Sequence, residues 1–357
     1  MRETGGRQAP PRGRAGRVLA QLALGVVVTL IGAGLSAGAT VIASTAPPPV
    51  GVSTTPVDLG IAGETASIAW PDGVSAAAFD VEGVDDASGA TGAESALPIA
   101  SIAKLVTMLV VLDRAPLEQG AQGPTLTMGE ADLALRSAAV RRGAAVMPMT
   151  LGQQLTQRQL LDAAMLQSSA NAATTLAQWV FGSQETYIGA ATAWLAAHDL
   201  GGIQIADATG LSRRNVATAS DLLRLMELVD GEPVLRQITG QRQAVVPGMG
   251  VVANTNGSLG LAGIDSGKTG SLRASGRTVL VGATTSVAGI ELRIHAALLG
   301  VQDGVDRDAA IASLVASVAE HVVEREVVVE RAPVATYEAP WGAVLRLHAR
   351  SMLAVVV

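Results

Sequence analysis

Only two lysines occur among the 357 residues of this chain, whereas arginines supply the other basic side chains. Lys104 follows Ser101 by three positions, and Lys268 directly precedes Thr269 and Gly270. A buried lysine can have a lowered pKa and act as a base, while an arginine always keeps its proton. A neutral Lys104 requires burial or a second cation close by, and Lys268 can supply that cation. The two lysines therefore predict a fold that brings two distant segments of the chain into one site.

Ser101 and Lys104 lie three positions apart in a predicted helix, so their side chains share one face. Serine is a weak nucleophile until a base removes its proton, and Lys104 is the candidate base. Ser169 and Asn171 form the second of three polar segments and lie between the two lysines. Ser169 can relay a proton from Lys104 to a leaving amine, and Asn171 offers both a donor and an acceptor to a substrate amide. Residues 168–171 also suit an ordinary helix N-cap, which is the alternative interpretation.

Lys268, Thr269 and Gly270 are predicted to lie on a strand at the edge of a sheet. A substrate peptide can align with such an edge through main-chain hydrogen bonds. The cation of Lys268 and the hydroxyl of Thr269 suit a substrate carboxylate, and Gly270 allows a close approach.

From about residue 65 onward, the pattern of apolar and polar residues changes along the chain. The start favours two strands around Pro71–Gly73, then a loop over 84–94 and a helix that opens at Pro98. The middle favours helices, and the end favours strands with short glycine-containing connections. We expect helices at 130–139, 156–166, 171–181, 185–198, 220–228 and 306–325, and strands at 264–269, 277–284 and 291–300. The sequence therefore predicts a helical block inserted between two halves of an α/β unit.

Residues 18–57 contain no charged side chain, and the stretch over 18–43 is apolar enough to cross a bilayer. Five arginines and one acidic residue precede it, so we expect the N-terminus in the cytoplasm and the remaining chain outside. A signal peptide cleaved near 37–39 is the alternative. We predict a basic cytoplasmic tail at 1–17, a transmembrane anchor at 18–45, a proline-containing linker at 46–64, a catalytic domain at 65–325 and a short β-prone appendage at 326–357.

The composition excludes several classes of function. The net charge of −6 argues against a nucleic-acid partner. The chain has no cysteine, which excludes disulfides, thiolate metal sites and cysteine nucleophiles. Its four histidines do not have metal-ligand spacing, so we expect no metal and no cofactor.

The three polar segments occur in the order typical of penicillin-binding proteins and serine β-lactamases. From about 65 to 325 the chain resembles the D-alanyl-D-alanine carboxypeptidases of peptidase family S11. The resemblance rests on four segments, 98–104, 160–173, 207–222 and 263–271. It implies a serine β-lactamase/DD-peptidase-like α/β fold, with an antiparallel sheet flanked by helices and an inserted helical subdomain.

The resemblance also implies a role for each candidate residue. Ser101 would be the nucleophile, Lys104 the base and Ser169 the proton relay, while Asn171, Lys268 and Thr269 would bind the substrate. Backbone N–H groups of Ser101 and Ser271 would form an oxyanion hole beside Gly270. The substrate would be the stem peptide of peptidoglycan, cleaved through an acyl-enzyme on the outer face of the cell membrane, and β-lactams would be covalent inhibitors.

Two features depart from the family pattern. The family usually has an acidic residue after the asparagine of the second motif, where this chain has Ala172. The larger C-terminal β-domain of the family is reduced here to a short tail. Two alternatives remain, a β-lactamase and a catalytically weak wall-binding protein. Class A β-lactamases require a glutamate that activates water, and none of Glu185, Glu227 and Glu232 has the expected sequence setting.

Overall fold

The computed structural model describes residues 68–84, 87–273 and 275–322, together with strand residues 51–54, 324–328, 333–338, 344–348 and 353–356. The chain divides into two compact units. The larger unit comprises Gly60–Arg325 with Ala354–Val357, and the smaller one comprises Met1–Leu59 with Glu326–Leu353.

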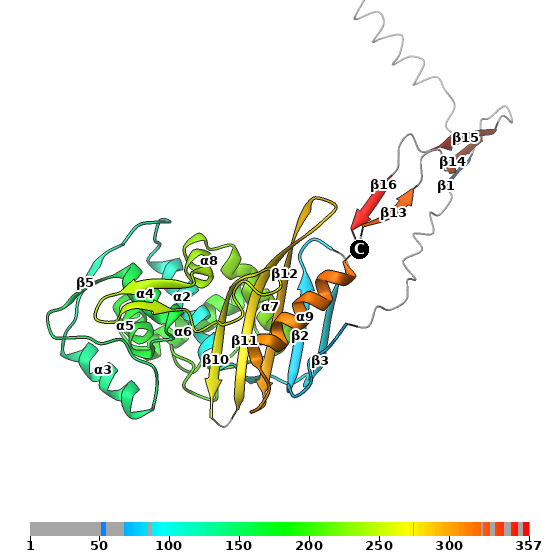
Figure 1. The fold of residues 1–357 in the computed structure, drawn as a ribbon. Coiled ribbons are helices and arrows are strands. Elements are labelled where there is room, and N and C mark those ends of the chain that lie inside the picture. Colours follow the sequence, from blue (N-terminus) through cyan, green and yellow to red (C-terminus); the bar gives the residue numbers. More distant parts are fainter. Residues whose placement is uncertain are drawn as a thin grey trace, which may run out of the picture. The chain divides into compact units, whose positions relative to one another are not determined.

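A five-stranded antiparallel sheet forms one half of the larger unit (Figure 1). The strand order is β10-β11-β12-β2-β3, so β10 is an edge strand. The strands are β2 (Ala76–Val81), β3 (Ser88–Gly92), β10 (Ile264–Leu272), β11 (Gly276–Val287) and β12 (Ile290–Val301). All four pairings are antiparallel. This sheet, with its flanking helices, confirms the predicted fold class.

Two helices cover opposite faces of the sheet, namely α7 (Ala219–Asp230) and α9 (Arg307–His321). Successive residues of a strand point to opposite faces, and the chain uses this alternation. Ala76 and Ala78 belong to the core that contains α7, whereas Ala77 belongs to the core that contains α9. The sheet is therefore buried on both faces.

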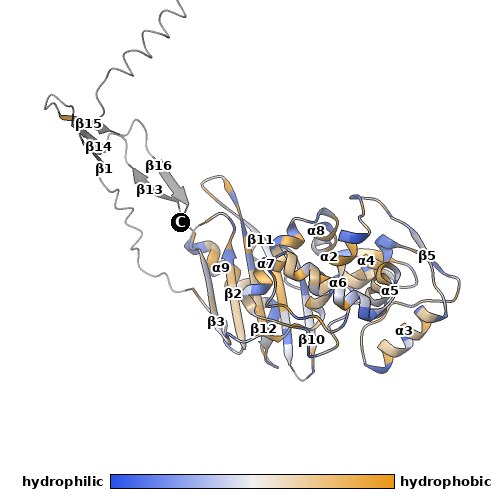
Figure 2. Cartoon of the chain, turned by 180° about the vertical axis from the view of Figure 1, so that it is seen from behind, coloured by the Kyte–Doolittle hydropathy of each residue, from blue (hydrophilic) through white to orange (hydrophobic). Residues whose placement is uncertain are grey.

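The inserted helical subdomain contains α2 (Ala103–Arg114), α3 (Glu130–Arg141), α4 (Gln157–Leu166), α5 (Ala170–Phe181), α6 (Gln184–Ala197) and α8 (Pro233–Gly240). Helix α2 is buried over ten consecutive residues, as expected for a helix that is apolar nearly all round. Figure 2 shows hydrophobic residues concentrated in the strands and in the helices around α2. The short strand pairs of the larger unit are β4 (Leu97–Pro98) with β7 (Val216–Ala217), β5 (Thr125–Thr127) with β6 (Gln154–Thr156), and β8 (Gln243–Val246) with β9 (Gly250–Ala253).

The six helices predicted by sequence pattern between 130 and 325 occur within a few residues of the expected bounds. Side-chain caps explain two of their starts. The Thr156 side chain caps α4 in a capping box with Gln159, and the Asp306 side chain caps α9.

The predictions for the segment before the nucleophile were wrong. Pro98 does not open a helix, because it pairs with Val216 in β4, and α2 begins only after a 3₁₀ turn at Ala100–Ile102. The segment 66–79 contains one strand rather than two among its described residues, and the predicted loop at 84–94 contains β3. Helix α8 and the β8–β9 hairpin were not predicted.

The smaller unit contains a three-stranded sheet of β1 (Gly51–Thr54), β14 (Pro333–Glu338) and β15 (Val344–His348). Near the end of the chain, β13 (Glu324–Val328) pairs with β16 (Leu353–Val356). The predicted anchor at 18–45 lies outside the described residues. In the part of the chain that the structure describes, no helix has both the length and the apolar character that a membrane span requires.

Candidate active site

Ser101 lies in the 3₁₀ turn that joins β4 to α2. The residue before it, Ala100, has a φ of 49°, a left-handed conformation that alanine rarely adopts. The surroundings hold this turn in place, because Ile99 N–H donates to the Asn215 carbonyl and Thr278 Oγ1 donates to the Ile99 carbonyl. The strained turn therefore presents Ser101 at the start of a buried helix. Such strain is often found at reactive residues.

Lys104 lies within hydrogen-bond distance of Ser101. Its Nζ is 2.9 Å from Ser101 Oγ and 2.6 Å from the carbonyl oxygen of Thr209. The side chain is only 1% exposed. Burial lowers the pKa of Lys104 to about 7, and the charge of Asp207 opposes this shift to a smaller extent. At neutral pH, a large fraction of Lys104 is therefore uncharged, and this neutral amine can accept the Ser101 proton.

Asp207 fixes the loop that carries the Thr209 carbonyl. Its carboxylate accepts hydrogen bonds from the backbone N–H groups of Thr209, Gly210 and Ser212 and from the Thr209 hydroxyl. Burial alone would raise the pKa of Asp207, but these hydrogen bonds lower it overall. Asp207 therefore stays ionised and holds the carbonyl against which Lys104 is positioned.

The second polar segment differs from the prediction by one residue. The catalytic cavity, defined here as the cavity of about 300 Å³ beside Ser101 and Lys104, is lined by Ser168 and Ala170. Ser169 does not line it and is fully buried at the N-cap of α5. Ser168 has a φ of 57°, so the loop holds it in a left-handed conformation before the helix begins. Ser168 is thus the serine of this segment that lines the catalytic cavity, and the hydroxyl oxygens of Ser168 and Ser169 are both buried without a hydrogen-bond partner among the described residues.

Asn171 does not line the catalytic cavity either. Its Oδ1 accepts from the N–H of Met147, and its Nδ2 donates to the Met147 carbonyl and lies 3.2 Å from Met149 Sδ. This amide is therefore occupied in clamping a loop to α5, and it is not available to a substrate. If the second motif is Ser168-Ser169-Ala170, then Asn171 occupies the position where the resembled family usually has an acidic residue, and Ala170 replaces the motif asparagine.

Ser168 is a second candidate for the relay beside the predicted Ser169, because it lines the catalytic cavity, and substitution distinguishes the two. Ser168→Ala should slow acylation by a β-lactam by ~10²-fold, because a positioned proton donor contributes ~10²–10⁴-fold. Ser169→Ala should stay within about threefold of the wild type, since its hydroxyl makes no cap hydrogen bond. Stopped-flow acylation rates for the two variants provide the measurement. The reverse order of effects would return the relay to Ser169.

Strand β10 supplies the third polar segment. Thr269, Gly270 and Ser271 line the catalytic cavity, and Lys268 is buried, with its Nζ donating to the Thr269 carbonyl at 3.0 Å. A Cβ on Gly270 would lie 2.8 Å from Ala100 Cβ and 2.9 Å from Ser101 N. Glycine is therefore required for β10 to pack against the turn that carries the nucleophile. The edge position predicted for this segment is confirmed.

The two lysines are coupled electrostatically. Burial lowers the pKa of Lys268 well below its ordinary value, and the charges of Lys104 and Arg307 lower it further. Two buried ammonium groups close together oppose each other's protonation, so the pair holds fewer than two protons at neutral pH. Such a coupling was predicted from the sequence, because lysine occurs at only these two positions of the chain.

Arg307 was missed by the sequence analysis, although it also lines the catalytic cavity. It lies at the start of α9, where the sequence showed only a helix cap. Its guanidinium donates two hydrogen bonds to Asp308, at 2.9 and 2.7 Å, which orient it. Thr255 lines the same wall and lies 3.2 Å from Thr269, hydroxyl to hydroxyl. This wall thus presents a cation and two hydroxyls, which suits a carboxylate.

One cluster of potential metal ligands lies elsewhere, among the described residues Asp80, Glu227 and His295. The nitrogens of His295 face the carboxylates of Asp80 and Asp230, and the nearest distances are 3.4 and 3.0 Å. Burial opposes the charged imidazole, but these two carboxylates together raise the pKa of His295 to about 9. His295 is therefore paired with these two carboxylates and favours its protonated form at neutral pH.

Comparisons with known proteins concern the family and the fold of the chain. The family model of the D-alanyl-D-alanine carboxypeptidases matches residues 87–302. The chain is 33% identical over 142 residues to a D-alanyl-D-alanine endopeptidase of Pseudomonas aeruginosa, a match that covers 40% of this chain and 42% of the relative. The chain therefore spans less than half of that relative's length.

Two solved structures from Mycobacterium tuberculosis are similar over most of their length. A penicillin-binding protein homologue is 25% identical with a TM-score of 0.60, covering 70% of this chain and 93% of that chain. A D-alanyl-D-alanine carboxypeptidase is 24% identical with a TM-score of 0.59, covering 72% and 93% respectively.

Proposed function

Because this chain belongs to the D-alanyl-D-alanine carboxypeptidase family, we propose that it is a serine peptidase that removes the terminal D-alanine from peptidoglycan stem peptides. The observation that carries the proposal is the 2.9 Å distance between Lys104 Nζ and Ser101 Oγ, with Lys104 buried and its pKa lowered. A surface serine–lysine pair would leave the lysine charged and unable to act as a base.

The proposed reaction proceeds in two steps. In the first, Lys104 takes the Ser101 proton while Oγ attacks the carbonyl carbon, and backbone N–H groups of Ser101 and Ser271 stabilise the oxyanion. The proton held by Lys104 passes through a relay serine, Ser168 or Ser169, to the leaving D-alanine amine as the C–N bond breaks, and an ester to Ser101 remains. In the second step, Lys104 takes a proton from water as the water oxygen attacks this ester, the ester C–O bond breaks, Ser101 Oγ regains a proton, and the shortened peptide leaves with a free carboxyl group.

A terminal carboxylate is the group best suited to the wall formed by Thr255, Thr269 and Arg307, with Lys268 buried beside Thr269 in the same strand. Its negative charge would raise the pKa of Lys268 when the substrate binds. Lys268 would then hold a proton, and its charge would favour the neutral form of Lys104. Substrate binding itself would thus set the protonation states that the reaction needs.

Substitution of Lys268 tests this role. Lys268→Ala should lower kcat/KM by ~10²-fold on a free-acid peptide, because charge-assisted hydrogen bonds are worth ~1.5–3 kcal/mol each. Lys268→Arg should retain much more activity, since the cation remains. The loss for Lys268→Ala should shrink to below about tenfold on the same peptide with an amidated terminus, where the partner charge is absent. Equal losses on both peptides would mean that Lys268 does not bind the carboxylate.

Labelling with a fluorescent penicillin tests the proposed function directly. Penicillin mimics the D-alanyl-D-alanine end, so it should acylate the protein at Ser101, and mass mapping of the labelled peptide identifies the site. Release of D-alanine from a pentapeptide measures the carboxypeptidase activity. Absence of both labelling and release would contradict the proposal.

One observation favours a second candidate, a catalytically weak wall-binding protein. Ala170 lines the catalytic cavity, whereas the Asn171 amide is bonded to the Met147 backbone, so this segment offers the cavity no free side-chain amide. Slow labelling combined with tight binding to peptidoglycan would favour this candidate. The β-lactamase alternative loses support, since no glutamate is among the described residues that line the catalytic cavity.

We also propose that the catalytic unit works on the outer face of the membrane, with residues 18–45 as its anchor. The support is the apolar stretch and the arginines that precede it. Protease treatment of intact cells should remove the catalytic unit, whereas a cytoplasmic protein would remain uncut. Because the similar relative from Pseudomonas aeruginosa is named an endopeptidase, cross-linked peptides should be assayed beside linear ones.

A further inference from the structure

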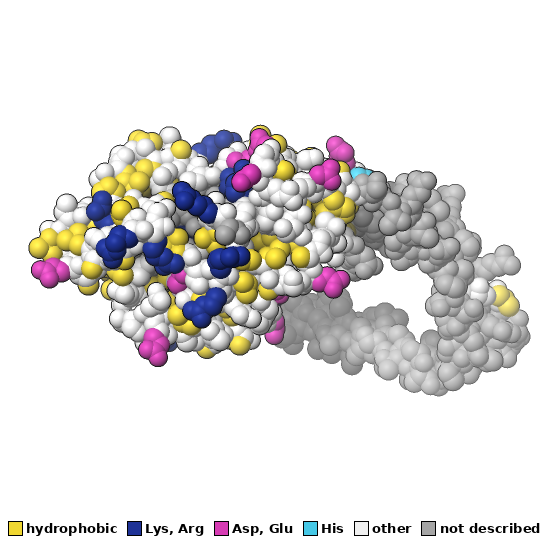
Figure 3. Space-filling view, turned by 90° about the horizontal axis from the view of Figure 1, so that it is seen from below, with side chains coloured by type: hydrophobic (Ala, Val, Ile, Leu, Met, Phe, Trp, Pro, Cys, Tyr) yellow, Lys and Arg dark blue, Asp and Glu magenta, His cyan; other side chains and the backbone are white. Residues whose placement is uncertain are grey.

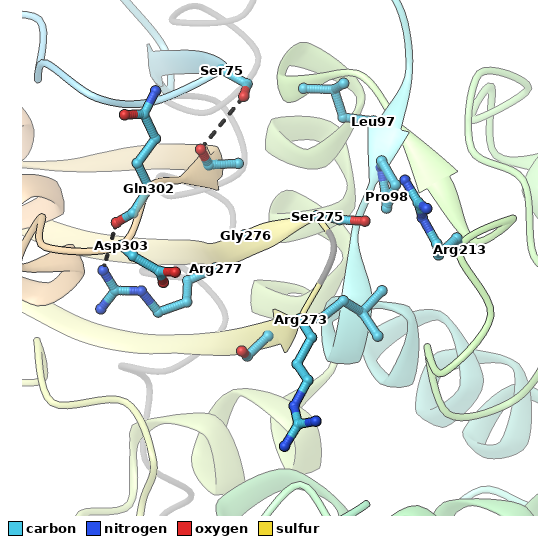
Figure 4. Close-up of a pocket in the computed structure, with 13 residues that line it drawn as sticks. Ser75, Leu97, Pro98, Arg213, Arg273, Ser275, Gly276, Arg277, Gln302 and Asp303 are labelled. Carbon is cyan, nitrogen blue, oxygen red and sulfur yellow. Dashed lines mark hydrogen bonds between the residues drawn. The ribbon is translucent and has the colours of Figure 1, made fainter. Parts of the chain in front are cut away.

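A second cavity adjoins the catalytic cavity at the C-terminal end of β10. It has a volume of about 640 Å³ and shares Ser271 with the catalytic cavity. Its walls come from β4, the turn between β10 and β11, and the segment after β12 (Figure 4). The reaction steps described above use none of its residues except Ser271. We call it the arginine cavity, after Arg213, Arg273 and Arg277.

The charge of the arginine cavity is positive. Three arginines and a single carboxylate, that of Asp303, line it. Arg213 and Arg273 are exposed and take part in none of the ion pairs found between described residues. Figure 3 shows basic side chains spread over the lower face of the molecule, with acidic ones mainly toward its rim. A chain of net charge −6 thus presents a basic surface here, which attracts anions.

Part of the arginine cavity is a fixed wall. The Arg277 guanidinium donates to the backbone carbonyls of Gln302, at 2.9 Å, and of Val305. Its Nε is buried without a hydrogen-bond partner among the described residues, and the same is true of Ser275 Oγ. In Figure 4, Arg213 lies beside Pro98 on the side toward which Ser275 points, and Arg277 extends to the other side. Carbonyl partners orient the Arg277 guanidinium but leave its charge unneutralised.

The path of a substrate peptide leads to this cavity. Its terminal carboxylate would lie near Lys268, Thr269 and Arg307, and its scissile bond beside Ser101. The preceding residues would then run along the free edge of β10 toward Arg273. An extended chain rises ~3.3 Å per residue and points alternate side chains the same way. On this path, the residue two or three positions before the scissile bond would lie at the arginine cavity.

We propose that the arginine cavity binds a carboxylate that the substrate peptide carries two or three residues before the scissile bond. This inference rests on the proposed function, because it takes the direction of the peptide from the proposed carboxylate wall. It adds a determinant of specificity on the acyl side of the bond. The chain would accordingly distinguish peptides that share the same D-alanyl-D-alanine end.

The test uses two sets of peptides that are identical except for one carboxylate, which is free in one peptide and amidated in the other. One set carries this group two residues before the scissile bond and the other set carries it three residues before. In at least one set, the wild type should show a kcat/KM about tenfold higher for the free carboxylate, since guanidinium–carboxylate pairs are strong and partly solvated here. The double variant Arg213→Gln/Arg273→Gln should bring this ratio to near one. Arg214→Gln, which removes a neighbouring exposed arginine outside the cavity, is the matched control and should keep the ratio.

The outcomes separate this inference from the proposed function. Equal kcat/KM values for both peptides of each set in the wild type would overturn the inference, as would a ratio that persists in the double variant. If penicillin still labelled the wild type and the double variant in either case, the proposed function would remain supported. A ratio that falls toward one in the double variant but not in Arg214→Gln supports the inference, and thermal melts of all variants verify folding.

Discussion

Ser101→Ala should abolish acylation by penicillin while the protein remains folded. Ser101 Oγ is the hydroxyl 2.9 Å from the buried Lys104 amine, and removal of a nucleophile costs ~10³-fold or more in rate. The substitution removes one oxygen from a partly exposed side chain, so we expect the melting temperature to change little. The measurement is fluorescence of the labelled protein after electrophoresis, followed by mass mapping of the wild-type adduct.

A matched control is Ser137→Ala, since Ser137 is exposed on α3 and bonds only within its own helix. It should label like the wild type. If Ser101→Ala still took up the label, or if the adduct mapped to Ser168, the nucleophile would be assigned wrongly.

Lys104→Arg should be nearly as damaging as Lys104→Ala. Arginine keeps a positive charge but does not release its proton, so it cannot serve as the base. We expect acylation to fall ~10²–10⁴-fold in both variants, the usual contribution of a positioned base. If Lys104→Arg retained more than about a tenth of the wild-type rate, the contribution of Lys104 would be electrostatic rather than that of a base.

The pH profile gives an independent view of Lys104. Its pKa is lowered to about 7 by burial, and only the neutral amine can take a proton. The second-order rate of acylation should therefore rise as the pH increases through about 7 and then level off, because it reflects the free enzyme. A rate that stayed flat between pH 6 and 8 would separate this amine from the proton transfer.

The sequence predicted those parts of the fold that local chemistry specifies. The helices from α3 to α7 follow from apolar periodicity and from caps such as Thr156, and β10 to β12 follow from their alternating or continuous apolar runs. The three polar segments were found because the residue types are unusual and their order is informative. Lysine was expected only where guanidinium fails, and both lysines are indeed buried and coupled.

The parts that failed depend on tertiary contacts. Which residue of 168–171 lines the catalytic cavity depends on where α5 begins, and the structure places Ser168 there, while the relay role of Ser169 stays a prediction. Pro98 was assigned to a helix because proline suits a first turn. In the structure it lies in a short strand instead, because it pairs with Val216, which is distant in the sequence. Arg307 had no distinguishing local signal, since it reaches the catalytic cavity only because α9 packs against β11 and β12 of the sheet.

Strand β10 is an edge strand of the sheet. An edge that can bind a substrate peptide can also pair with any other extended chain, including β10 of a second molecule. Many proteins protect such edges with bulges or with charged side chains that point inward, since neither allows a second sheet to pair easily. This strand has the first of these features, a bulge between Ile264 and Ser266. The irregularity that interrupts pairing with β11 would thus also hinder the pairing of β10 with a second copy of the chain when no substrate lies along the edge.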